Sequence, residues 1–534
     1  MLEENLLIIL SLLLSVSLLS MLSNRLGIAY PIFLVVAGLI IGVIPDVPNV
    51  TLKPDIVFII FLPPLLYSAA LNTSWRDFRA NIRPISLLAI GLVIFTSCII
   101  ALLAHAIIPD FSLALGFLLG GIISPPDAVA ATSIISKLKI PKRIVTILEG
   151  ESLVNDASSI IVFKFALAAV FTGQFMLWKA SLDFIMVAGV GIFVGLAIAY
   201  VIYLIHRFLP TDSVTDTAIS LISPYIMYLT AEHFGYSGVL AVVSGGLFLS
   251  NFSHKYLNYD SRLQLQSVWN TVVFLLNGTV FILIGMQIPF IMQGMENYSA
   301  GEAIGIALII SLASVLIRIF WVYPGTYLPR MLSRKIRERE PYPTPKSVFI
   351  VAWSGMRGVV SLASALTIPL YLKNKEMFPH RNLILFITFA VILFTLVLQG
   401  ITLPYLIRIL NIQENSSEND SNFIMLNKDL AQTVLHHIDE NYAREIRDND
   451  MYKRLRGIYQ RQQEEYDQQL QNTPEKNLPK QSNKRLRILM LEMIKVQRQQ
   501  LETFEKEDKY SDELLRNKEN ELDFSEARIR KSSV

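Results

Sequence analysis

The sequence is poor in cysteine and, over most of its length, in charged residues. Cys98 is the only cysteine among 534 residues, so a disulfide within one chain is excluded. Residues 1–411 contain 46 charged side chains, whereas the 123 residues of 412–534 contain 45. With 52% hydrophobic residues, the chain is also too apolar for an ordinary soluble protein. These features predict a membrane region, 1–411, followed by a hydrophilic tail, 412–534.

The tail is expected to be mostly helical, with a break near 472–479 and an amphipathic helix over 484–506. Its 21 basic and 24 acidic residues give a negative net charge, so nucleic acid is not an expected partner. We expect a regulatory or interaction role for this region.

Apolar segments long enough to cross a bilayer recur throughout residues 1–411. A helix needs about 20 residues to span the hydrocarbon core. Thirteen such segments are predicted, at 4–22, 27–44, 54–72, 84–107, 111–136, 144–171, 182–206, 215–234, 237–252, 266–290, 303–328, 346–370 and 383–411. The sequence therefore predicts an all-α polytopic membrane protein with about 13 transmembrane helices.

The basic residues of the loops predict the orientation. With the N-terminus outside, the inner loops carry 17 Lys and Arg residues and the outer loops carry five. Basic residues accumulate on the cytoplasmic side of membrane proteins. We expect a multi-pass protein of the cell (inner) membrane, in contact with its lipid, with the N-terminus outside and the tail in the cytoplasm.

Two predicted spans contain residues that interrupt a helix. Pro125 and Pro126 lie midway along the fifth span, and Gly355 and Gly358 lie within the twelfth. Proline removes an amide donor and glycine relaxes the backbone, so both spans are expected to unwind there. Interrupted helices seven spans apart have opposite topology, which is typical of transporters built from inverted repeats.

The sixth span contains a dense group of polar residues at membrane depth. Its segment 149–159 reads EGESLVNDASS and includes three carboxylates. Ionisable side chains inside a membrane are costly and are usually functional. At about 100° per residue, Ser152 and Asp156 share one helix face, and Asn155 lies beside them. Glu151 points to a different neighbour.

A second carboxylate, Asp127, directly follows the proline pair of the fifth span. Oxygen ligands suit hard cations such as Na⁺, and a broken helix offers free carbonyls. Asp127, Asp156 and the Ser152 hydroxyl are therefore expected to bind one Na⁺ ion. A helix cap at the break is the alternative interpretation of Asp127, and Glu149 is either a cap or a functional acid.

Other charges at membrane depth need partners, because an unpaired buried guanidinium is very costly. Arg357 in the twelfth span is expected to pair with Glu151. Asp156 is the alternative, but a permanent ion pair would remove its ability to titrate. Arg318 and Lys164 are expected to have structural roles.

Three motifs together resemble the sodium/proton exchanger superfamily. They are SPPDAVA at 124–130, LEGESLVNDA at 148–157 and GMRG at 355–358, on the fifth, sixth and twelfth predicted spans. The resemblance covers residues 5–411. Within this superfamily, the chain resembles the first monovalent cation:proton antiporter family. It resembles the bacterial members of the branch that has an Asn-Asp pair.

This resemblance implies roles for the same residues. Asp156 would bind cation and proton in competition, and Asp127 would help to form the site between two crossed, unwound helices. Asn155 would be structural or a ligand through water. The pair of Glu151 and Arg357 would hold the core bundle together.

The resemblance also implies how the molecule is assembled and moves. A homodimer is expected, in which a core bundle moves like an elevator against a dimer or scaffold part. The core would include 84–171 and 303–411, and the dimer part 4–72 and 215–290. The Asn-Asp pair implies electroneutral exchange, whereas Pro126 stands where many relatives have threonine, so the sequence leaves Na⁺, Li⁺ and K⁺ open.

The expected function is secondary antiport of Na⁺ against H⁺. Burial disfavours the charged form of Asp156 and a bound cation favours it, so cation and proton would displace each other. A K⁺/H⁺ antiporter of the same architecture is the closest alternative. A cation channel is less expected because no filter sequence is present, and so is an intramembrane protease using Asp127 and Asp156. No catalytic residue and no cofactor beyond the transported ions are expected.

Overall fold

The computed structural model forms two compact units, Met1–Glu414 and Asn415–Val534. The sequence predicts the boundary between membrane region and tail between residues 411 and 412. The structure describes residues 2–26, 29–44, 54–135, 138, 140–173, 177–209, 211–293, 298–340, 342–372, 376–412, 416–471 and 490–501, and single positions or short stretches at 503, 518, 522, 524–526 and 529.

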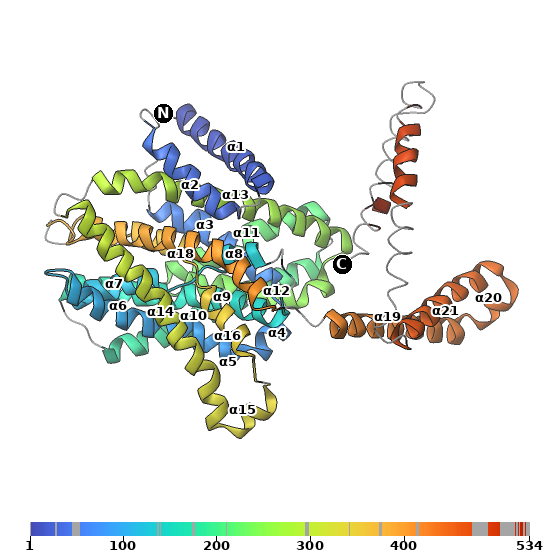
Figure 1. Ribbon diagram of the computed structural model, residues 1–534. Helices are drawn as coiled ribbons and strands as arrows, with labels where there is room; N and C mark the ends of the chain where they lie inside the picture. The colour runs from blue at the N-terminus through green and yellow to red at the C-terminus, as the bar shows by residue number, and fades with distance from the viewer. Residues whose placement is uncertain are drawn as a thin grey trace. The chain divides into compact units, whose positions relative to one another are not determined.

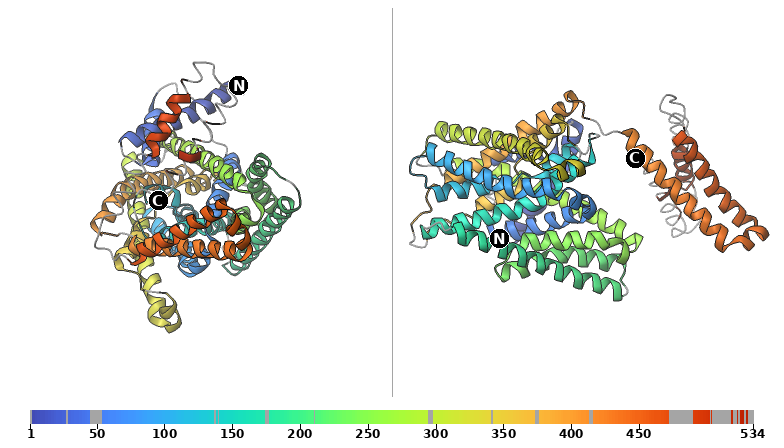
Figure 2. Two further views of the ribbon diagram at one scale, coloured as in Figure 1. Left: turned by 90° about the vertical axis from the view of Figure 1, so that its right-hand side faces the viewer. Right: turned by 90° about the horizontal axis from the view of Figure 1, so that it is seen from below.

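The described residues of the first unit form helices joined by short segments, with one isolated bridge between Tyr371 and Met377 (Figure 1). Its helices are α1 (Leu2–Leu26), α2 (Tyr30–Val43), α3 (Pro54–Asn72), α4 (Trp75–Ala80), α5 (Ile82–Ser86), the π-helical η1 (Leu87–Leu92), α6 (Val93–Ile107), α7 (Leu113–Ile123), α8 (Ala128–Ile135), α9 (Lys142–Thr172), α10 (Leu177–Phe208), α11 (Ser213–His233), α12 (Gly238–Tyr256), α13 (Tyr259–Gln293), α14 (Ala300–Leu332), α15 (Arg334–Arg339), α16 (Pro345–Trp353), α17 (Val359–Leu366) and α18 (Arg381–Ile409). Figure 2 shows that most of the long helices run roughly parallel to one another.

Each of the predicted spans coincides with one helix or with consecutive helices of this unit. By length and composition, eight helical stretches among the described residues can cross a membrane, and α2 and part of α3 are shorter apolar helices. The all-α polytopic fold is thus confirmed, and the count of 13 crossings stays a prediction.

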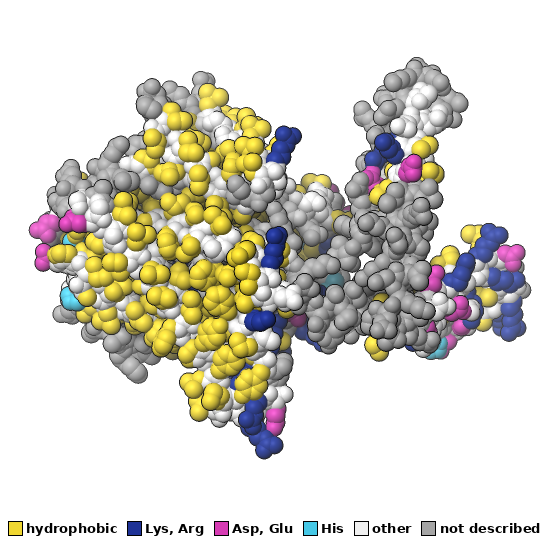
Figure 3. Space-filling view, viewed as in Figure 1, with side chains coloured by type: hydrophobic (Ala, Val, Ile, Leu, Met, Phe, Trp, Pro, Cys, Tyr) yellow, Lys and Arg dark blue, Asp and Glu magenta, His cyan; other side chains and the backbone are white. Residues whose placement is uncertain are grey.

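The outer surface of the first unit is apolar, as contact with lipid requires. Leu102, Ile185 and Phe193 are 62%, 69% and 71% exposed although each lies on a long apolar helix. Figure 3 shows apolar side chains over most of one face, with Lys and Arg along one edge. A surface of this kind is stable in a bilayer and would aggregate in water.

Helix α9 lies between two hydrophobic cores. Leu148 and Phe163 of α9 belong to a core shared mainly with α2, α6, α7, α13, α14 and α18. Leu153 and Ala157 belong to a second core, shared with α3, α10, α11 and α12. Because α9 packs against both cores, its residues Glu151, Asn155 and Asp156 are buried inside the protein.

The second unit contains α19 (Ser416–Asn441), α20 (Ala443–Asp448) and α21 (Asp450–Gln471). Helices α19 and α21 pack against each other and are joined by the ion pairs Arg456–Asp439, at 2.7 Å, and Lys428–Asp467, at 2.5 Å. The predicted break at 472–479 lies outside the described residues.

Candidate functional site

The fifth and twelfth predicted spans are each divided by a short non-helical segment. The first segment, 124–127, separates α7 from α8 and contains the proline pair. The second, 354–358, separates α16 from α17 and contains two glycines. Backbone groups at these positions lack helical partners, so other protein groups must satisfy them at membrane depth.

The two segments bind each other. The amide of Asp127 donates a hydrogen bond to the carbonyl of Met356, at 2.6 Å. In the other direction, the guanidinium of Arg357 donates to the carbonyl of Ser124. The amide of Arg357 donates to Thr395 Oγ1 of α18, at 3.1 Å. Each break therefore supplies the hydrogen-bond partners that the other lacks.

The carboxylate of Asp127 lies between two helix N-termini. Its Oδ1 accepts a hydrogen bond from the amide of Val129, at 2.8 Å, and the amides of Ala130 and Val359 lie near the same carboxylate. A carboxylate placed there satisfies free amides and favours the positive ends of both helix dipoles. A Cβ at Gly358 would collide with Asp127 Oδ2, so only glycine fits opposite this side chain. Asp127 is thus a helix cap, and it also lines the pocket described below.

Ser152 and Asn155 attach α9 to the broken span. Ser152 Oγ accepts from the amide of Ala128 at the start of α8, at 3.3 Å. Asn155 Nδ2 donates to the carbonyl of Pro126, at 3.1 Å. Both side chains hold the backbone of the break in place, one turn apart on the same helix.

Asp156 differs from the other polar residues of the site. Its side chain is only 6% exposed. In the described part of the chain, its carboxylate has no hydrogen bond and no ion pair. A buried carboxylate without a protein partner is strongly disfavoured as a bare anion, so it needs a proton or a cation.

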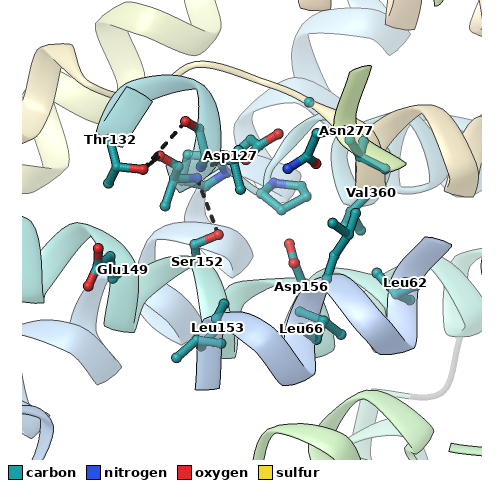
Figure 4. A pocket seen from close by; sticks show the side chains of 18 of the residues that line it. Leu62, Leu66, Asp127, Thr132, Glu149, Ser152, Leu153, Asp156, Asn277 and Val360 are labelled. Atoms are coloured by element: carbon teal, nitrogen blue, oxygen red, sulfur yellow. Dashed lines mark hydrogen bonds between the residues drawn. The ribbon is translucent and has the colours of Figure 1, made fainter. Parts of the chain in front are cut away.

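Asp127, Ser152 and Asp156 line a pocket of about 250 Å³ (Figure 4). Helices α3, α8, α9, α13 and α17 contribute to it, and leucine and valine side chains form much of the wall. The polar side chains that line it are Ser68, Asn72, Asp127, Thr132, Glu149, Ser152, Asp156, Asn277 and Ser361. The pocket therefore brings together Asp127, Ser152 and Asp156 of the predicted site. Glu149, for which the sequence left a helix cap and a functional acid open, also lines it.

Asn277 of α13 was not predicted. It is 1% exposed, and among the described residues neither Oδ1 nor Nδ2 has a hydrogen-bond partner. Figure 4 shows its side chain at the pocket, on the side opposite α9. A buried amide without partners costs about 1–3 kcal/mol, which indicates a ligand or water in the pocket. In the sequence, Asn277 is a single amide within an apolar span, and this pattern does not distinguish a binding residue from a buried structural residue.

The predicted ion pair of Glu151 with Arg357 is wrong, because Glu151 binds Arg318 of α14. The two Nη atoms of Arg318 lie 2.5 and 2.7 Å from the two carboxylate oxygens, and both side chains are 1% exposed. Carbonyls of α16 accept further hydrogen bonds from Arg318, and a Cβ at Gly355 would collide with its side chain. Glu151 faces α14 on the helix surface away from the pocket, as its angle from Asp156 required. Its influence on Arg357 is electrostatic, without a hydrogen bond.

The predicted structural residue Lys164 lies away from the pocket. It pairs with Glu232 of α11, at 3.0 Å, and its side chain is 52% exposed. Within the described ranges, no group of three or more His, Cys, Asp or Glu residues is placed to hold a metal ion. The pocket offers three carboxylates, with hydroxyls and amides, and these ligands suit a small monovalent cation better than a transition metal.

The fold and the pocket define a polytopic membrane protein with a buried carboxylate site at a crossing of two broken helices. The chain belongs to the sodium/hydrogen exchanger family: the family model described as "Sodium/hydrogen exchanger, transmembrane" matches residues 9–409.

Curated relatives and a solved structure agree with this family. A "Sodium, potassium, lithium and rubidium/H(+) antiporter" of Bacillus pumilus is 35% identical over 389 residues, which cover 71% of this chain and 58% of that protein. The "Na(+)/H(+) antiporter ApNhaP" of Aphanothece halophytica is 33% identical over 444 residues, covering 82% and 80%. The sodium proton antiporter MjNhaP1 of Methanocaldococcus jannaschii has the same fold, with a TM-score of 0.61 and 21% identity over 76% of this chain and 98% of that one. The chain thus matches little more than half the length of the Bacillus relative.

The bidentate pair gives a first prediction. Arg318→Met should lower the free energy of unfolding in detergent by about 3–5 kcal/mol, because it leaves Glu151 buried and unpaired. The double variant Glu151→Gln, Arg318→Met should lose less than the sum of the two single variants. Lys164→Met is the control and should cost no more than about 1 kcal/mol, since its ion pair is exposed. A larger coupling of Glu151 with Arg357 than with Arg318 would contradict the assignment.

Proposed function

We propose that this protein is a secondary antiporter that exchanges Na⁺ for H⁺ across the cell membrane. The observation that carries the proposal is the buried Asp156 carboxylate, which lines the pocket and has no partner among the residues that the structure describes. The names of the two relatives include Na⁺ and H⁺ as exchanged ions, which supports the same function.

Exchange follows from one group that cannot be left as a bare anion. Either a proton or a cation neutralises Asp156 when the pocket is closed to water, and each excludes the other. If only a neutralised site can change its side of access, one ion must return for each ion that leaves. The coupling therefore needs no second site and no direct contact between cation and proton.

Asp127 supports the cation in a different way. The amide of Val129 in α8 binds its carboxylate and holds this group in place, with lone pairs left to face the pocket. Ser152 and Thr132 add hydroxyl oxygens from α9 and α8. Asn155, bound to the carbonyl of Pro126, would act by positioning the break.

Several further features belong to the same proposal. Electroneutral exchange rests on the Asn-Asp pair, since Asn155 adds no second charge to Asp156. The cell membrane as location, with the N-terminus outside and the tail in the cytoplasm, rests on the loop charges. A homodimer, with 84–171 and 303–411 moving against 4–72 and 215–290, rests on the family resemblance. Transport rather than enzymatic catalysis is the proposed activity.

The variant Asp156→Asn tests the central claim. It should abolish cation-dependent proton movement, because an amide neither releases a proton nor pairs with a cation in its place. The measurement is dequenching of a pH dye in everted vesicles after addition of Na⁺. Glu232→Gln, which removes a carboxylate outside the pocket, should retain exchange, and both variants should unfold at the wild-type temperature. Normal exchange by Asp156→Asn would exclude it as the shared group.

Asn277→Leu tests the contribution of α13. Loss of one amide ligand, worth about 1 kcal/mol, should raise the KM for Na⁺ about fivefold and leave the maximal rate nearly unchanged. Val273→Leu, which changes an apolar lining residue of the same helix, is the matched control. An unchanged KM in Asn277→Leu would remove this residue from the site.

A K⁺/H⁺ antiporter is the second candidate, because the Bacillus relative is named for potassium as well as sodium. Dye dequenching should be titrated with Na⁺, Li⁺ and K⁺ over a range of pH. We expect the lowest half-saturating concentration for Na⁺, and a lower one for K⁺ would favour the second candidate. A membrane current that accompanies the pH change would instead favour a channel or an electrogenic exchanger.

A further inference from the structure

Three arginines share one carboxylate at the end of α9 remote from Asp156. Their guanidinium nitrogens lie 3.3 Å (Arg83), 3.7 Å (Arg143) and 2.7 Å (Arg330) from Oε2 of Glu340. We call these four residues the Glu340 cluster. They come from α5, α9, α14 and the end of α15. Arg143 lies 13 residues before Asp156, or about 20 Å along the helix, so the cluster is separate from the pocket.

The cluster has an excess of positive charge. Three guanidinium groups and one carboxylate leave two positive charges. Among the described residues, Glu340 is the only carboxylate that forms an ion pair with these arginines. Like charges at this spacing repel one another strongly when they are partly removed from water. A bound anion would relieve that repulsion.

The cluster also has hydrogen-bond donors without acceptors. In the described part of the chain, the buried atoms Arg83 Nη1 and Arg330 Nε have no partner. Arg143 uses its Nε for Asn81 Oδ1, at 3.1 Å, and Arg330 donates to the carbonyl of Thr326. The N-terminus of α9, directly before Arg143, has no side-chain cap and adds the positive end of a long helix dipole.

The position of the cluster indicates where an anion would come from. Arg83 and Arg143 have side chains 30% and 35% exposed, so they can be reached from outside. On the last turn of α14, Met331 and Leu332, which follow Arg330, are 70% and 79% exposed. Figure 3 shows basic side chains at the edge of the apolar face in the region of α15. Such a boundary between apolar and basic surface is where lipid headgroups lie.

We propose that the Glu340 cluster binds the phosphate of an anionic phospholipid headgroup. Guanidinium forks match phosphate oxygens in geometry and hold them with paired hydrogen bonds. Basic pockets between membrane helices are suited to such headgroups. The bound phosphate would join α5, α9 and α14 at this end of the bundle, and a free phosphate ion is the other source of the same chemistry.

The test uses the full chain, purified in detergent, and measures its unfolding temperature with added phosphatidylglycerol or phosphatidylcholine. Phosphatidylglycerol should raise the unfolding temperature more than phosphatidylcholine. The double variant Arg83→Gln, Arg143→Gln should lose this difference. The control Arg334→Gln, Arg337→Gln removes two exposed charges of α15 outside the cluster and should keep it. A difference that persists in the first double variant would overturn the proposal.

Glu340→Gln should change the phosphatidylglycerol shift in the opposite direction, by enlarging it. It raises the excess charge from two to three, so it should lower the unfolding temperature in phosphatidylcholine and enlarge the shift caused by phosphatidylglycerol. If the four residues form only an ion-pair network, this variant should be destabilised equally in both lipids, which would contradict the proposal.

Two further measurements complete the test. Inorganic phosphate at matched concentration should not reproduce the shift, and a full shift with phosphate alone would overturn the assignment to lipid. If the double variant does not fold, Arg143→Lys keeps the charge and removes the guanidinium fork. Native mass spectrometry should then show at least a fivefold lower ratio of retained phosphatidylglycerol to phosphatidylcholine than in the wild type, and an unchanged ratio would count against the cluster.

Discussion

A backbone that leaves the helical conformation inside a membrane must find its hydrogen-bond partners within the protein, and this requirement shapes the centre of the molecule. The breaks at 124–127 and 354–358 satisfy it by crossing, so that Asp127 and Arg357 each bind the opposite segment. Asn155 of α9 binds a carbonyl of the first break. Asp127 and Ser152 of the pocket are thus committed to the backbone of the first break, whereas Asn277 has no partner among the described residues.

Asp127 and Asp156, two of the three carboxylates that line the pocket, show how the same chemical group acquires different roles. Asp127 is stabilised by amides at two helix N-termini, which favour its negative charge whether or not an ion is bound. Asp156 faces the same pocket without such donors in the described structure. Together they offer a cation two oxygen ligands, one bound by a backbone amide and one without a partner among the described residues.

The sequence allowed the spans and both breaks to be predicted, because proline, glycine and apolar length act locally. It did not allow the partner of Glu151 to be chosen. Arg318 and Arg357 both lie at membrane depth, and the choice depends on the rotation of three helices and on the space that Gly355 leaves for Arg318. Asn277 was missed for a related reason, since a single amide in an apolar span has no distinguishing pattern until a pocket is seen beside it.

The distribution of polar contacts around α9 bears on how the proposed exchange could proceed. On one side, Glu151 joins α9 to α14 through a fully buried ion pair, and Asn155 joins it to the broken span. On the other side, Leu153 and Ala157 belong to the apolar core through which α9 meets α3 and α12, and the polar contact of Lys164 with α11 is exposed. Apolar surfaces can slide past one another without leaving buried polar groups unpaired, whereas the ion pair cannot be broken cheaply. A movement that carries α9 together with α14 and both breaks, and that shears along the apolar side, would therefore preserve the cation site while changing its access.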